Sequence, residues 1–535
     1  MLCKEVTIDE NNKLITSGSF QLGSIEHPLP LDNLDENIVC KDALFADWPK
    51  VDAIIGNPPY QAKNKMQEEF GPSYVKSIRK RYPEISGRAD YCVYWFRRAH
   101  DELPPNGRAG LVGTNTIRQN FSREGGLDYI VYNNGTITEA VSSQVWSGDA
   151  VVHVSIVNWI KGKDNSEKML FTQLGDKQDS EWASVKLSHI NSSLSNAIDV
   201  ASAGKIEINT FTKNCFQGQT HGNEGFLLTF GQAKNILRRS PKEIEILFPY
   251  ATAEDLLSTS PPSPKRCVID LNNLDINDAS TYKIAFGIIC NKVLPQMEFA
   301  AKEENNKTGK TIGPRQNHFK KWWKFWRDRP ELISRLSGME RVIVCARVTK
   351  RPIFEFMSTR IRPNDALMCF AFNDDYSFGI IQSIFHWAWF VNRCSTLKRD
   401  FRYTSESVFD TFPWPQTKDE ALVESVARHS KELRDIRWNF INKNRQTLRD
   451  IYKNLELPGK NILKDAHNRL NEAVAEAYGI KEGENLLEFL LNINKQISLL
   501  DPTDENVNGP GLPQFVKDKS KYISNDCIDY ILDEK

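Results

Sequence analysis

Short apolar runs alternate with helix-like segments after a polar, turn-rich start of the chain. Runs bounded by Gly, Asp, Asn or Pro are typical of strands, and their alternation with helices predicts an α/β layer. The predicted strands are Asn37–Cys40, Ala53–Ile55, Ala109–Thr114, Ile137–Val141 and Val151–Ile160. Between the second and the third, Ala89–Leu103 carries aromatic and apolar residues at the spacing of a core-facing helix, so we expect a helix there.

The pattern changes twice further along the chain. Ser, Asn, Lys and Asp dominate residues 164–214, which predicts a hydrated connection with a boundary near 205. Residues 215–415 are rich in aromatics, Pro and Gly, and we expect a largely irregular region with β-like runs at Arg341–Arg347 and Ala366–Phe372. After residue 418, two apolar faces at helical spacing predict amphipathic helices. These faces are Leu422, Val426, Leu433, Ile436 and Phe440, and Leu463, Ala466, Leu470, Val474 and Ala477.

Length and charge limit the choice of architecture. At 535 residues the chain exceeds the size of one hydrophobic core, about 250–300 residues, so several domains are expected. Basic and acidic residues number 69 each, so a polyanion would be held by a local patch and not by the field of the whole protein.

Cysteine spacing and apolar run lengths exclude further classes. The ten cysteines form no CxxC pair and no spacing typical of metal ligands, which predicts reduced thiols and no metal site. The chain has no signal-like apolar start and no stretch of about 20 uncharged apolar residues. We therefore expect a soluble, cytoplasmic protein with no membrane partner.

The strongest chemical signal is an apolar strand that runs directly into Asn57-Pro58-Pro59-Tyr60. Ligands bind at the carboxyl ends of strands in open α/β sheets. Two prolines stiffen the loop and remove two backbone donors, which leaves its carbonyl oxygens and the Asn57 amide oxygen as acceptors. Such acceptors can hold an amino group and free its lone pair to attack an electrophilic methyl, by positioning and without a strong base. Tyr60 could stack on a base that carries the amino group; the alternative is a plain turn with Tyr60 in the core.

Residues 306–329 form a strongly basic run, with eight Lys and Arg against Asp328 and with five interleaved aromatics. The cations could clamp nucleic-acid phosphates. The alternative is an amphipathic helix with core tryptophans and solvated lysines. We expect both in part, with Trp322, Trp323 and Trp326 mostly buried. The residues expected to touch DNA are Lys307, Lys310 and Arg315.

The sequence resembles the MmeI-like (type IIL) restriction–modification enzymes with an adenine-specific DNA methyltransferase. Besides the Asn57–Tyr60 string, the resemblance rests on strings in the family's order between about residues 26 and 500. They are Leu31-Asp32-Asn33, Lys41-Asp42-Ala43-Leu44, Gly87-Arg88-Ala89-Asp90-Tyr91, Tyr94-Trp95-Phe96, Gly110-Leu111-Val112-Gly113-Thr114-Asn115, Arg351-Pro352-Ile353-Phe354-Glu355-Phe356, Asp374-Asp375-Tyr376-Ser377-Phe378-Gly379 and Phe409-Asp410-Thr411-Phe412-Pro413-Trp414-Pro415.

The resemblance implies a division into four parts. A polar segment, residues 1–30, precedes an incomplete Rossmann-like methyltransferase domain of the S-adenosylmethionine-dependent class, residues 31–205. A mixed α+β target-recognition domain that binds double-stranded DNA follows at 206–417, and a helical region at 418–535. The implied reaction is methyl transfer from S-adenosylmethionine to the exocyclic amine of adenine at a specific DNA site, in a restriction–modification system.

The resemblance also implies roles for single residues. Asn57 and Pro58 would accept hydrogen bonds from the amine of the target adenine, and Tyr60 would stack on the extruded base. Trp146 would be the second face of that stack, or else a buried core residue. The other expected DNA contacts, since guanidinium forks match guanine edges and phosphates, are Arg347, Lys350, Arg360 and Arg362.

Two aspartates are expected near the cofactor. Asp42 would bind the adenine ring of S-adenosylmethionine, and the alternative is a turn or helix-cap aspartate. Asp90 would border the cofactor, and the alternative is a carboxylate that interacts with the dipole of the predicted helix.

Two parts of the family pattern are not found in the sequence: a Gly-rich cofactor loop with a ribose-binding acidic residue, and a nuclease domain. Gly18 and Gly23 lack the flanking strand and helix that such a loop needs. We therefore expect a split or truncated enzyme that needs a separate N-terminal polypeptide and does not cleave DNA. In the implied sheet the absent strand lies beside Ala53–Ile55, which should be an exposed apolar edge that invites pairing with another chain.

Two other functions stay open. The chain could be a non-catalytic DNA-binding or specificity protein, or an inactive remnant. It could also be a protein-glutamine methyltransferase, because the same loop can position a side-chain amide, although the basic and aromatic region after residue 215 argues against this.

Overall fold

The computed structural model describes residues 7–8, 14–15, 39–61, 63–146, 152–175, 177–196, 200, 203–309, 312–397, 400–455, 457–500 and 507–532. The chain divides into two compact units, Met1–Lys50 and Val51–Lys535. In the first, β1 (Thr7–Ile8) pairs antiparallel with β2 (Leu14–Ile15). Most of the predicted polar segment 1–30 lies outside the described residues, as does the start of the strand predicted at Asn37–Cys40. Its last two residues are described and are not in a strand.

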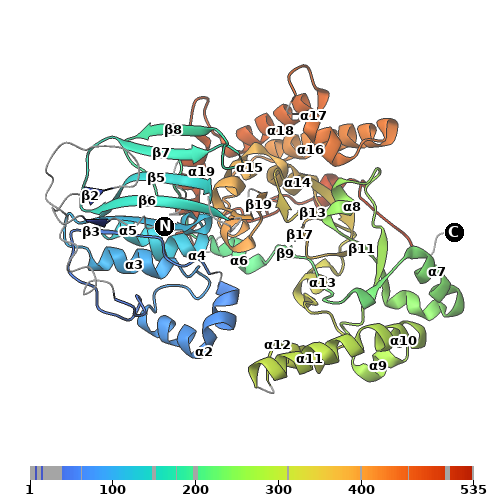
Figure 1. Cartoon of the computed structure of the whole chain (residues 1–535). Helices are drawn as coiled ribbons and strands as arrows, with labels where there is room; N and C mark the ends of the chain where they lie inside the picture. Colours follow the sequence, from blue (N-terminus) through green and yellow to red (C-terminus); the bar gives the residue numbers. More distant parts are fainter. Residues whose placement is uncertain are drawn as a thin grey trace. The chain divides into compact units, whose positions relative to one another are not determined.

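A mixed six-stranded sheet, in the order β3-β4-β6-β5-β7-β8, organises the start of the second unit (Figure 1). Its strands are β3 (Ala53–Gly56), β4 (Arg108–Thr114), β5 (Gly135–Val145), β6 (His153–Lys161), β7 (Lys168–Gln173) and β8 (Trp182–Leu187). β3 pairs parallel with β4, and β5 with β7, whereas the other neighbours are antiparallel. Four of the predicted strands thus share one sheet, and the predicted α/β class is confirmed.

The polar stretch 164–214, predicted to be a hydrated connection, instead contributes β7, β8 and the short helix α6 (Glu207–Thr212). β8 is an edge strand with largely exposed side chains, so polar residues are tolerated there. In β7 the ammonium of Lys168 is fully buried, yet it donates to Asp164 Oδ1 at 2.6 Å and to the carbonyl oxygen of Ser166 at 2.7 Å. Because a buried charge is tolerated when it is paired, a polar composition did not exclude a strand here.

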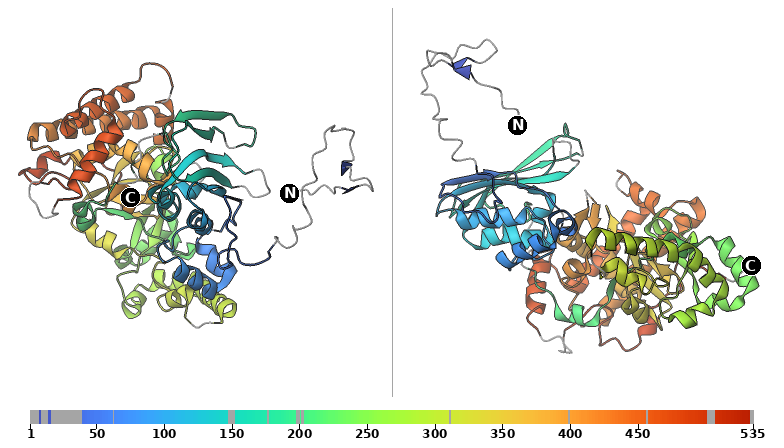
Figure 2. Two further views of the ribbon diagram at one scale, coloured as in Figure 1. Left: turned by 90° about the vertical axis from the view of Figure 1, so that its left-hand side faces the viewer. Right: turned by 60° about the horizontal axis from the view of Figure 1, so that its bottom comes forward.

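Helices cover one face of the sheet (Figure 2). They are α3 (Val93–Glu102), α4 (Asn120–Arg123) and α5 (Tyr129–Tyr132), and α3 is preceded by α2 (Lys63–Arg81). Phe96 of α3 stacks on Trp159 of β6, with ring centroids 5.7 Å apart and an interplanar angle of 18°. This contact packs the start of α3 against the sheet.

Residues 215–415, predicted to be largely irregular, form three small sheets. One is antiparallel with the order β15-β13-β17-β9, and its strands are β9 (Cys215–Gln217), β13 (Arg341–Ala346), β15 (Phe354–Ser358) and β17 (Leu367–Phe370). The second consists of β10 (Leu227–Leu228), β11 (Leu247–Ala251), β12 (Arg266–Ile269) and β16 (Arg362–Pro363). The third consists of β14 (Val348–Thr349), β18 (Ser395–Leu397) and β19 (Asp400–Arg402). Strands this short carry too few residues for a periodic signal.

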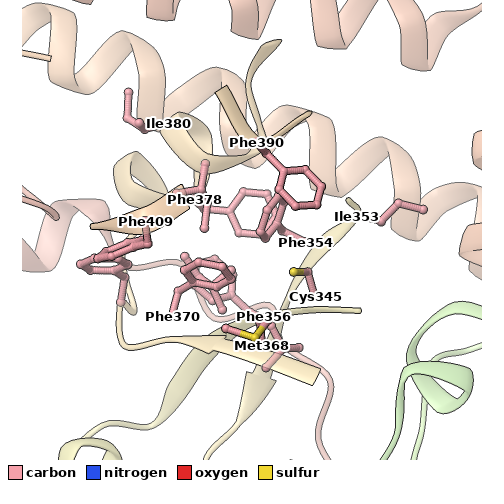
Figure 3. Packing of buried hydrophobic residues seen from close by; sticks show 14 of the residues in the cluster. Cys345, Ile353, Phe354, Phe356, Met368, Phe370, Phe378, Ile380, Phe390 and Phe409 are labelled. Atoms are coloured by element: carbon pink, nitrogen blue, oxygen red, sulfur yellow. The ribbon is translucent and has the colours of Figure 1, made fainter. Parts of the chain in front are cut away.

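Two hydrophobic cores hold this region together. The larger one lies between β13, β15 and β17 and the helices α14 (Asp375–Gln382) and α15 (Ile384–Arg393), where Phe356 and Phe378 pack with ring centroids 5.1 Å apart (Figure 3). The second lies around β12 and includes Phe226 and Trp322. Its helices are α7 (Phe230–Arg239), α10 (Lys283–Lys292) and α11 (Leu294–Thr308). Shorter helices of the region are α8 (Ala253–Leu257), α9 (Ile276–Ser280), α12 (Pro314–Phe319) and α13 (Pro330–Leu336).

The C-terminal helices follow the predicted faces. They are α16 (Glu420–Asn444), α17 (Leu448–Asn454), α18 (Ile462–Tyr478) and α19 (Leu486–Ile497). Leu433 of α16 and Leu470 of α18 are fully buried in the larger core, which confirms the two amphipathic helices. Residues 507–532, predicted to be helical, contain only one short 3₁₀ turn. There Ile528 pairs with β15 by backbone hydrogen bonds, because an edge strand offers unpaired donors and acceptors.

Among the helices within the described part of the chain, none combines the length and apolar character needed to cross a membrane.

Candidate functional site

The loop Asn57–Tyr60 leaves the carboxyl end of β3, as the sequence predicts. Pro58 is buried, whereas Asn57 and Pro59 are exposed, so the loop is anchored at one proline and presents the asparagine to solvent. The two prolines fix φ and donate no hydrogen bonds, which keeps the loop stiff. The Tyr60 hydroxyl donates to Asn57 Oδ1, so the two polar side chains of the loop lie together.

Tyr60 also contacts Trp146, which follows β5. The ring centroids lie 6.2 Å apart with an interplanar angle of 85°, an edge-to-face arrangement. Burial raises the pKa of the Tyr60 hydroxyl to about 12, with a smaller contribution from Cys92, so this hydroxyl is protonated at neutral pH and acts as a donor. Tyr60 and Trp146, the two aromatic residues that the sequence analysis expected to stack on a base, therefore lie together in the structure.

Asp90 lies just before α3, but its carboxylate does not cap that helix. Its Oδ2 accepts from the hydroxyls of Thr114 at 3.0 Å and Thr116 at 2.5 Å. Its backbone N–H donates to Ser122 Oγ at 3.0 Å. The sequence predicts a helix from Ala89, but α3 begins at Val93. The backbone amides of Asp90 and Tyr91 donate to groups outside the helix, because they bond to Ser122 Oγ and to the carbonyl oxygen of Gln61.

Thr114 and Thr116 are site residues that sequence reasoning did not name. Thr114 is the last residue of β4, the parallel neighbour of β3, and Thr116 lies just beyond it, so their side chains and the Asn57 loop share the carboxyl edge of the sheet. The signal was available, since polar residues directly after an apolar strand mark that edge. The Tyr91 amide further ties this edge to the loop by donating to the carbonyl oxygen of Gln61 at 3.0 Å.

Cys92 lies beside Thr114, with the sulfur 3.8 Å from its hydroxyl oxygen. Burial raises the pKa of the Cys92 thiol to about 11. It therefore stays a neutral thiol near pH 7 and is not an activated nucleophile.

Asp42 belongs to the first compact unit and lies in a turn. Its Oδ1 accepts from the amide of Leu44 at 2.9 Å, and its carbonyl oxygen accepts from the amides of Phe45 and Ala46. This is the geometry of a turn aspartate, one of the two alternatives for this residue. A role in cofactor binding stays a prediction.

The basic run 306–329 does not form one amphipathic helix. Its described part comprises the end of α11, then α12 and a turn-rich segment. Trp322 is buried, whereas Trp323 and Trp326 are half-buried. Lys307 is exposed and pairs with Glu303 on α11 at 3.4 Å, and Arg315 lies over the Trp326 ring at 5.0 Å. Lys310 lies outside the described residues.

The four other predicted DNA contacts differ in their surroundings. Lys350 is exposed. Arg360 pairs with Asp529 of the C-terminal segment. Arg362 donates to Asp270 Oδ2 at 2.9 Å and stacks on Phe248, so its guanidinium joins β16 to the second core. Arg347 donates to the carbonyl oxygen of Asp365 at 3.0 Å.

Comparisons with known proteins agree with this architecture. Residues 10–172 match the family model of the MmeI DNA-methyltransferase domain, and residues 205–416 match that of the MmeI target recognition domain. A solved structure of the type IIL restriction-modification enzyme MmeI in complex with DNA is similar with a TM-score of 0.68 and 20% sequence identity. It covers 84% of this chain and 57% of that one.

Two curated relatives also match parts of the sequence. DNA methyltransferase A of Bacillus subtilis (strain 168) is 21% identical over 502 residues, which are 89% of this chain and 52% of the relative. The type II methyltransferase M.BstVI of Geobacillus stearothermophilus is 32% identical over 71 residues, 13% of this chain and 12% of the relative. The chain thus spans about half the length of the first relative. With both domain models matched in order over most of its length, the chain belongs to the MmeI-like family and carries its DNA-methyltransferase domain followed by its target recognition domain.

Proposed function

We propose that this chain is a site-specific DNA methyltransferase of a restriction–modification system that transfers a methyl group from S-adenosylmethionine to the exocyclic amine of adenine. The observation that carries the proposal is the stiff Asn57–Tyr60 loop at the carboxyl end of β3, with Asn57 exposed and Tyr60 beside Trp146. Asp90, whose carboxylate is held by two threonines, lies just before α3.

The loop acts by positioning. Asn57 Oδ1 and the carbonyl oxygen of Pro58 accept the two hydrogens of the amine, which directs the nitrogen lone pair outward. For this the Tyr60 hydroxyl leaves Asn57 Oδ1, which it contacts in this structure. S-adenosylmethionine, when bound, would supply the methyl group and keep the electron pair of its carbon–sulfur bond, and the amine held by Asn57 and Pro58 would lose one proton to solvent.

The residues at this edge fit the cofactor in chemical character. When bound, S-adenosylmethionine supplies an electrophilic methyl on a positively charged sulfonium. Asp90 offers an oriented carboxylate for the cationic cofactor, because the hydroxyls of Thr114 and Thr116 fix its Oδ2. Tyr60 offers an aromatic face for a base outside the duplex stack, and Trp146, which is perpendicular to it in this structure, would turn to become the second face.

The proposal includes a further strand at this sheet. Among the described strands β3 pairs only with β4, and its Ile55 side chain is 87% exposed. An apolar strand with an open edge favours pairing. We therefore include in the proposal that a separate polypeptide supplies a strand here and completes the cofactor site.

The test is methyl transfer to duplex DNA by the full chain, with and without the N-terminal half of an MmeI-like enzyme, followed by mass spectrometry of the nucleosides. We expect N6-methyladenine with the added polypeptide and a loss of at least about 100-fold in Asn57→Ala, as expected when an oriented acceptor is removed. Asn444→Ala, at an exposed asparagine that ends α16, is the matched control and should keep full activity.

Other results would point elsewhere. DNA binding with no transfer under either condition would favour a non-catalytic specificity protein. Transfer that is unchanged in Asn57→Ala would remove the loop from the mechanism.

A further inference from the structure

Four arginines from separate stretches of the recognition region lie around the loop that joins β16 to β17. Arg327 and Arg329 lie at the end of the basic run 306–329, Arg347 follows β13, and Arg402 ends β19. Within this group the sequence named Arg347 singly as a DNA contact, and it placed Arg327 and Arg329 in the basic run whose cations could clamp phosphates. Figure 1 shows β9, β13 and β17 side by side, with α13 next to them. Arg347 follows β13 and Arg329 directly precedes α13.

Backbone pairing sets the positions of the first two. The segment after β9 runs between two others: the Gln219 amide donates to the carbonyl oxygen of Pro363 at 2.8 Å, and Thr220 exchanges two backbone hydrogen bonds of 3.0 Å with Arg327. Gly218 permits this approach, because a Cβ there would lie 2.1 Å from the carbonyl oxygen of Asn364. The close packing of three chain segments therefore fixes the backbone at Arg327.

Side-chain hydrogen bonds then join Arg329 to Arg347. Arg329 Nη2 donates to Gln217 Oε1 at 3.0 Å, and Gln217 Nε2 donates to the carbonyl oxygen of Asp365 at 3.2 Å. The same carbonyl oxygen accepts from Arg347 Nη1 at 3.0 Å. Both guanidinium groups are thus held in defined orientations, unlike the exposed ammonium groups of Lys307 and Lys350.

The backbone of Arg329 is unusual. Its φ of 54° and ψ of 55° lie in the left-handed region, which a residue with a side chain seldom adopts. Its Nε is buried and has no hydrogen-bond partner among the described residues. Strain and an unpaired buried donor are costs that a structure retains mainly at functional sites.

Charge points to an anionic or electron-rich ligand. Burial lowers the pKa of Arg329, and neighbouring Arg327 lowers it further. Burial also lowers the pKa of Arg347, followed by the effect of Arg402, while Asp365 opposes both shifts. Asp328 and Glu331 also oppose the shift at Arg329, so the four arginines face three carboxylates. This leaves an excess of positive charge, partly withdrawn from water, that a ligand with acceptor atoms would stabilise.

We propose that Arg327, Arg329 and Arg347 form a base-reading site, in which a held guanidinium fork donates to the two acceptors of a guanine edge in the major groove. This inference rests on the proposed function, since it requires that the chain binds DNA. Guanine O6 and N7 match the guanidinium fork, whereas a phosphate would accept a lysine as well. The oriented, half-buried forks of Arg329 and Arg347 suit sequence reading, with the exposed Arg327 beside them, whereas exposed lysines suit the DNA backbone.

The experiment is selection from a library of duplexes with a randomised central segment, using the full chain at about physiological salt, followed by sequencing. For the wild type we expect a motif that contains G·C pairs. Arg327→Gln, Arg329→Gln and Arg347→Gln should each relax one or two positions of that motif, with a loss of discrimination of about 5- to 150-fold there. Arg239→Gln, at an exposed arginine that ends α7, is the matched control and should keep the motif.

The lysine variants separate base edges from phosphates. If Arg327→Lys and Arg347→Lys show the same loss of base preference as the Gln variants, the guanidinium fork is required and the proposal stands. If affinity falls uniformly over all sequences and lysine restores it, the cluster binds phosphate and the proposal is overturned. An unchanged motif in all three Gln variants overturns it too, with the proposed function intact.

Folding and DNA binding are checked separately. Thermal unfolding shows whether each variant is folded. If Arg329→Gln does not fold, Arg327→Gln still tests the proposal, because the Arg327 side chain is exposed and its replacement should not unfold the protein. A wild-type chain that selects no duplex at all would overturn both this inference and the proposed function.

Discussion

Two edge strands of this protein, β3 and β15, both carry apolar side chains but have opposite surroundings. β15 is buried along its length, and Ile528 of the C-terminal segment covers its edge, donating to the carbonyl oxygen of Phe356 and accepting from the amide of Ser358, both at 2.8 Å. β3 pairs only with β4 among the described strands, and Ile55 is 87% exposed. A strand sequence thus sets the tendency to pair, whereas the partner that reaches the edge decides whether it is buried.

Buried charges hold the cover on β15. Arg434 of α16 is fully buried and pairs with Asp375 at 2.5 Å and with Asp526 of the C-terminal segment at 2.7 Å. Arg341 of β13 also pairs with Asp375, at 3.1 Å. The recognition region therefore ties its edge strand to a helix through an ion network, and β3 has no comparable network among the described residues.

Breaking this ion network should have the largest effect on stability, because it should uncover β15 and make its edge as open as that of β3. Arg434→Leu leaves Asp375 and Asp526 with less compensating charge in the interior, and we expect the free energy of unfolding to fall by about 3–5 kcal/mol. Chemical denaturation measures this loss, and hydrogen exchange at Phe356 and Ser358 should report an uncovered edge. Arg428→Leu, at an exposed arginine of the same helix, should change the unfolding free energy by less than about 0.5 kcal/mol. Equal effects of the two variants would show that the network does not hold the segment.

A weaker effect on stability should come from Asp410, a carboxyl group of the recognition region that is partly buried with only Lys205 among the described residues to offset the cost. Burial raises the pKa of Asp410 to about 6, while Lys205 opposes the shift. The folded protein therefore binds this proton more tightly than the unfolded chain does. The stability that protonation provides is present below the ordinary pKa of aspartate and is lost as the pH rises through about 6.

Asp410→Asn should remove this loss. We expect the variant to gain about 1 kcal/mol over the wild type between pH 4 and pH 7, a figure reduced for partial solvent screening. Urea denaturation at a series of pH values measures the difference, with Asp179→Asn at an exposed site as the control. A wild-type curve that runs parallel to that of Asp410→Asn over this range would contradict the shifted pKa.

The smallest effect on stability is expected at β3. Ile55→Lys replaces an exposed side chain, so the free energy of unfolding should change by less than about 0.5 kcal/mol. The added charge should nevertheless block strand addition and lower self-association in sedimentation velocity. Val185→Lys on β8, the other edge of the same sheet, is the matched control and should not change association. A loss of more than 1 kcal/mol would mean that Ile55 is buried in solution.

Local patterns alone determined several features of this protein. The run from an apolar strand into Asn57-Pro58-Pro59-Tyr60 placed the candidate site at a carboxyl edge, and helical periodicity located α16 and α18. These signals lie within one element, where side-chain spacing and proline geometry act over a few residues.

Tertiary structure decided what depends on distant partners. β7 and β8 form in a polar stretch because Lys168 pairs with Asp164 and because β8 lies at the edge of the sheet, beside β7. α3 began late because Asp90 bonded to Thr114 and Thr116. The C-terminal segment became extended on β15, and four arginines met around one loop. Each of these outcomes requires contacts between residues far apart in the chain, and a period of hydrophobic residues carries no information about which distant edge or charge will be met.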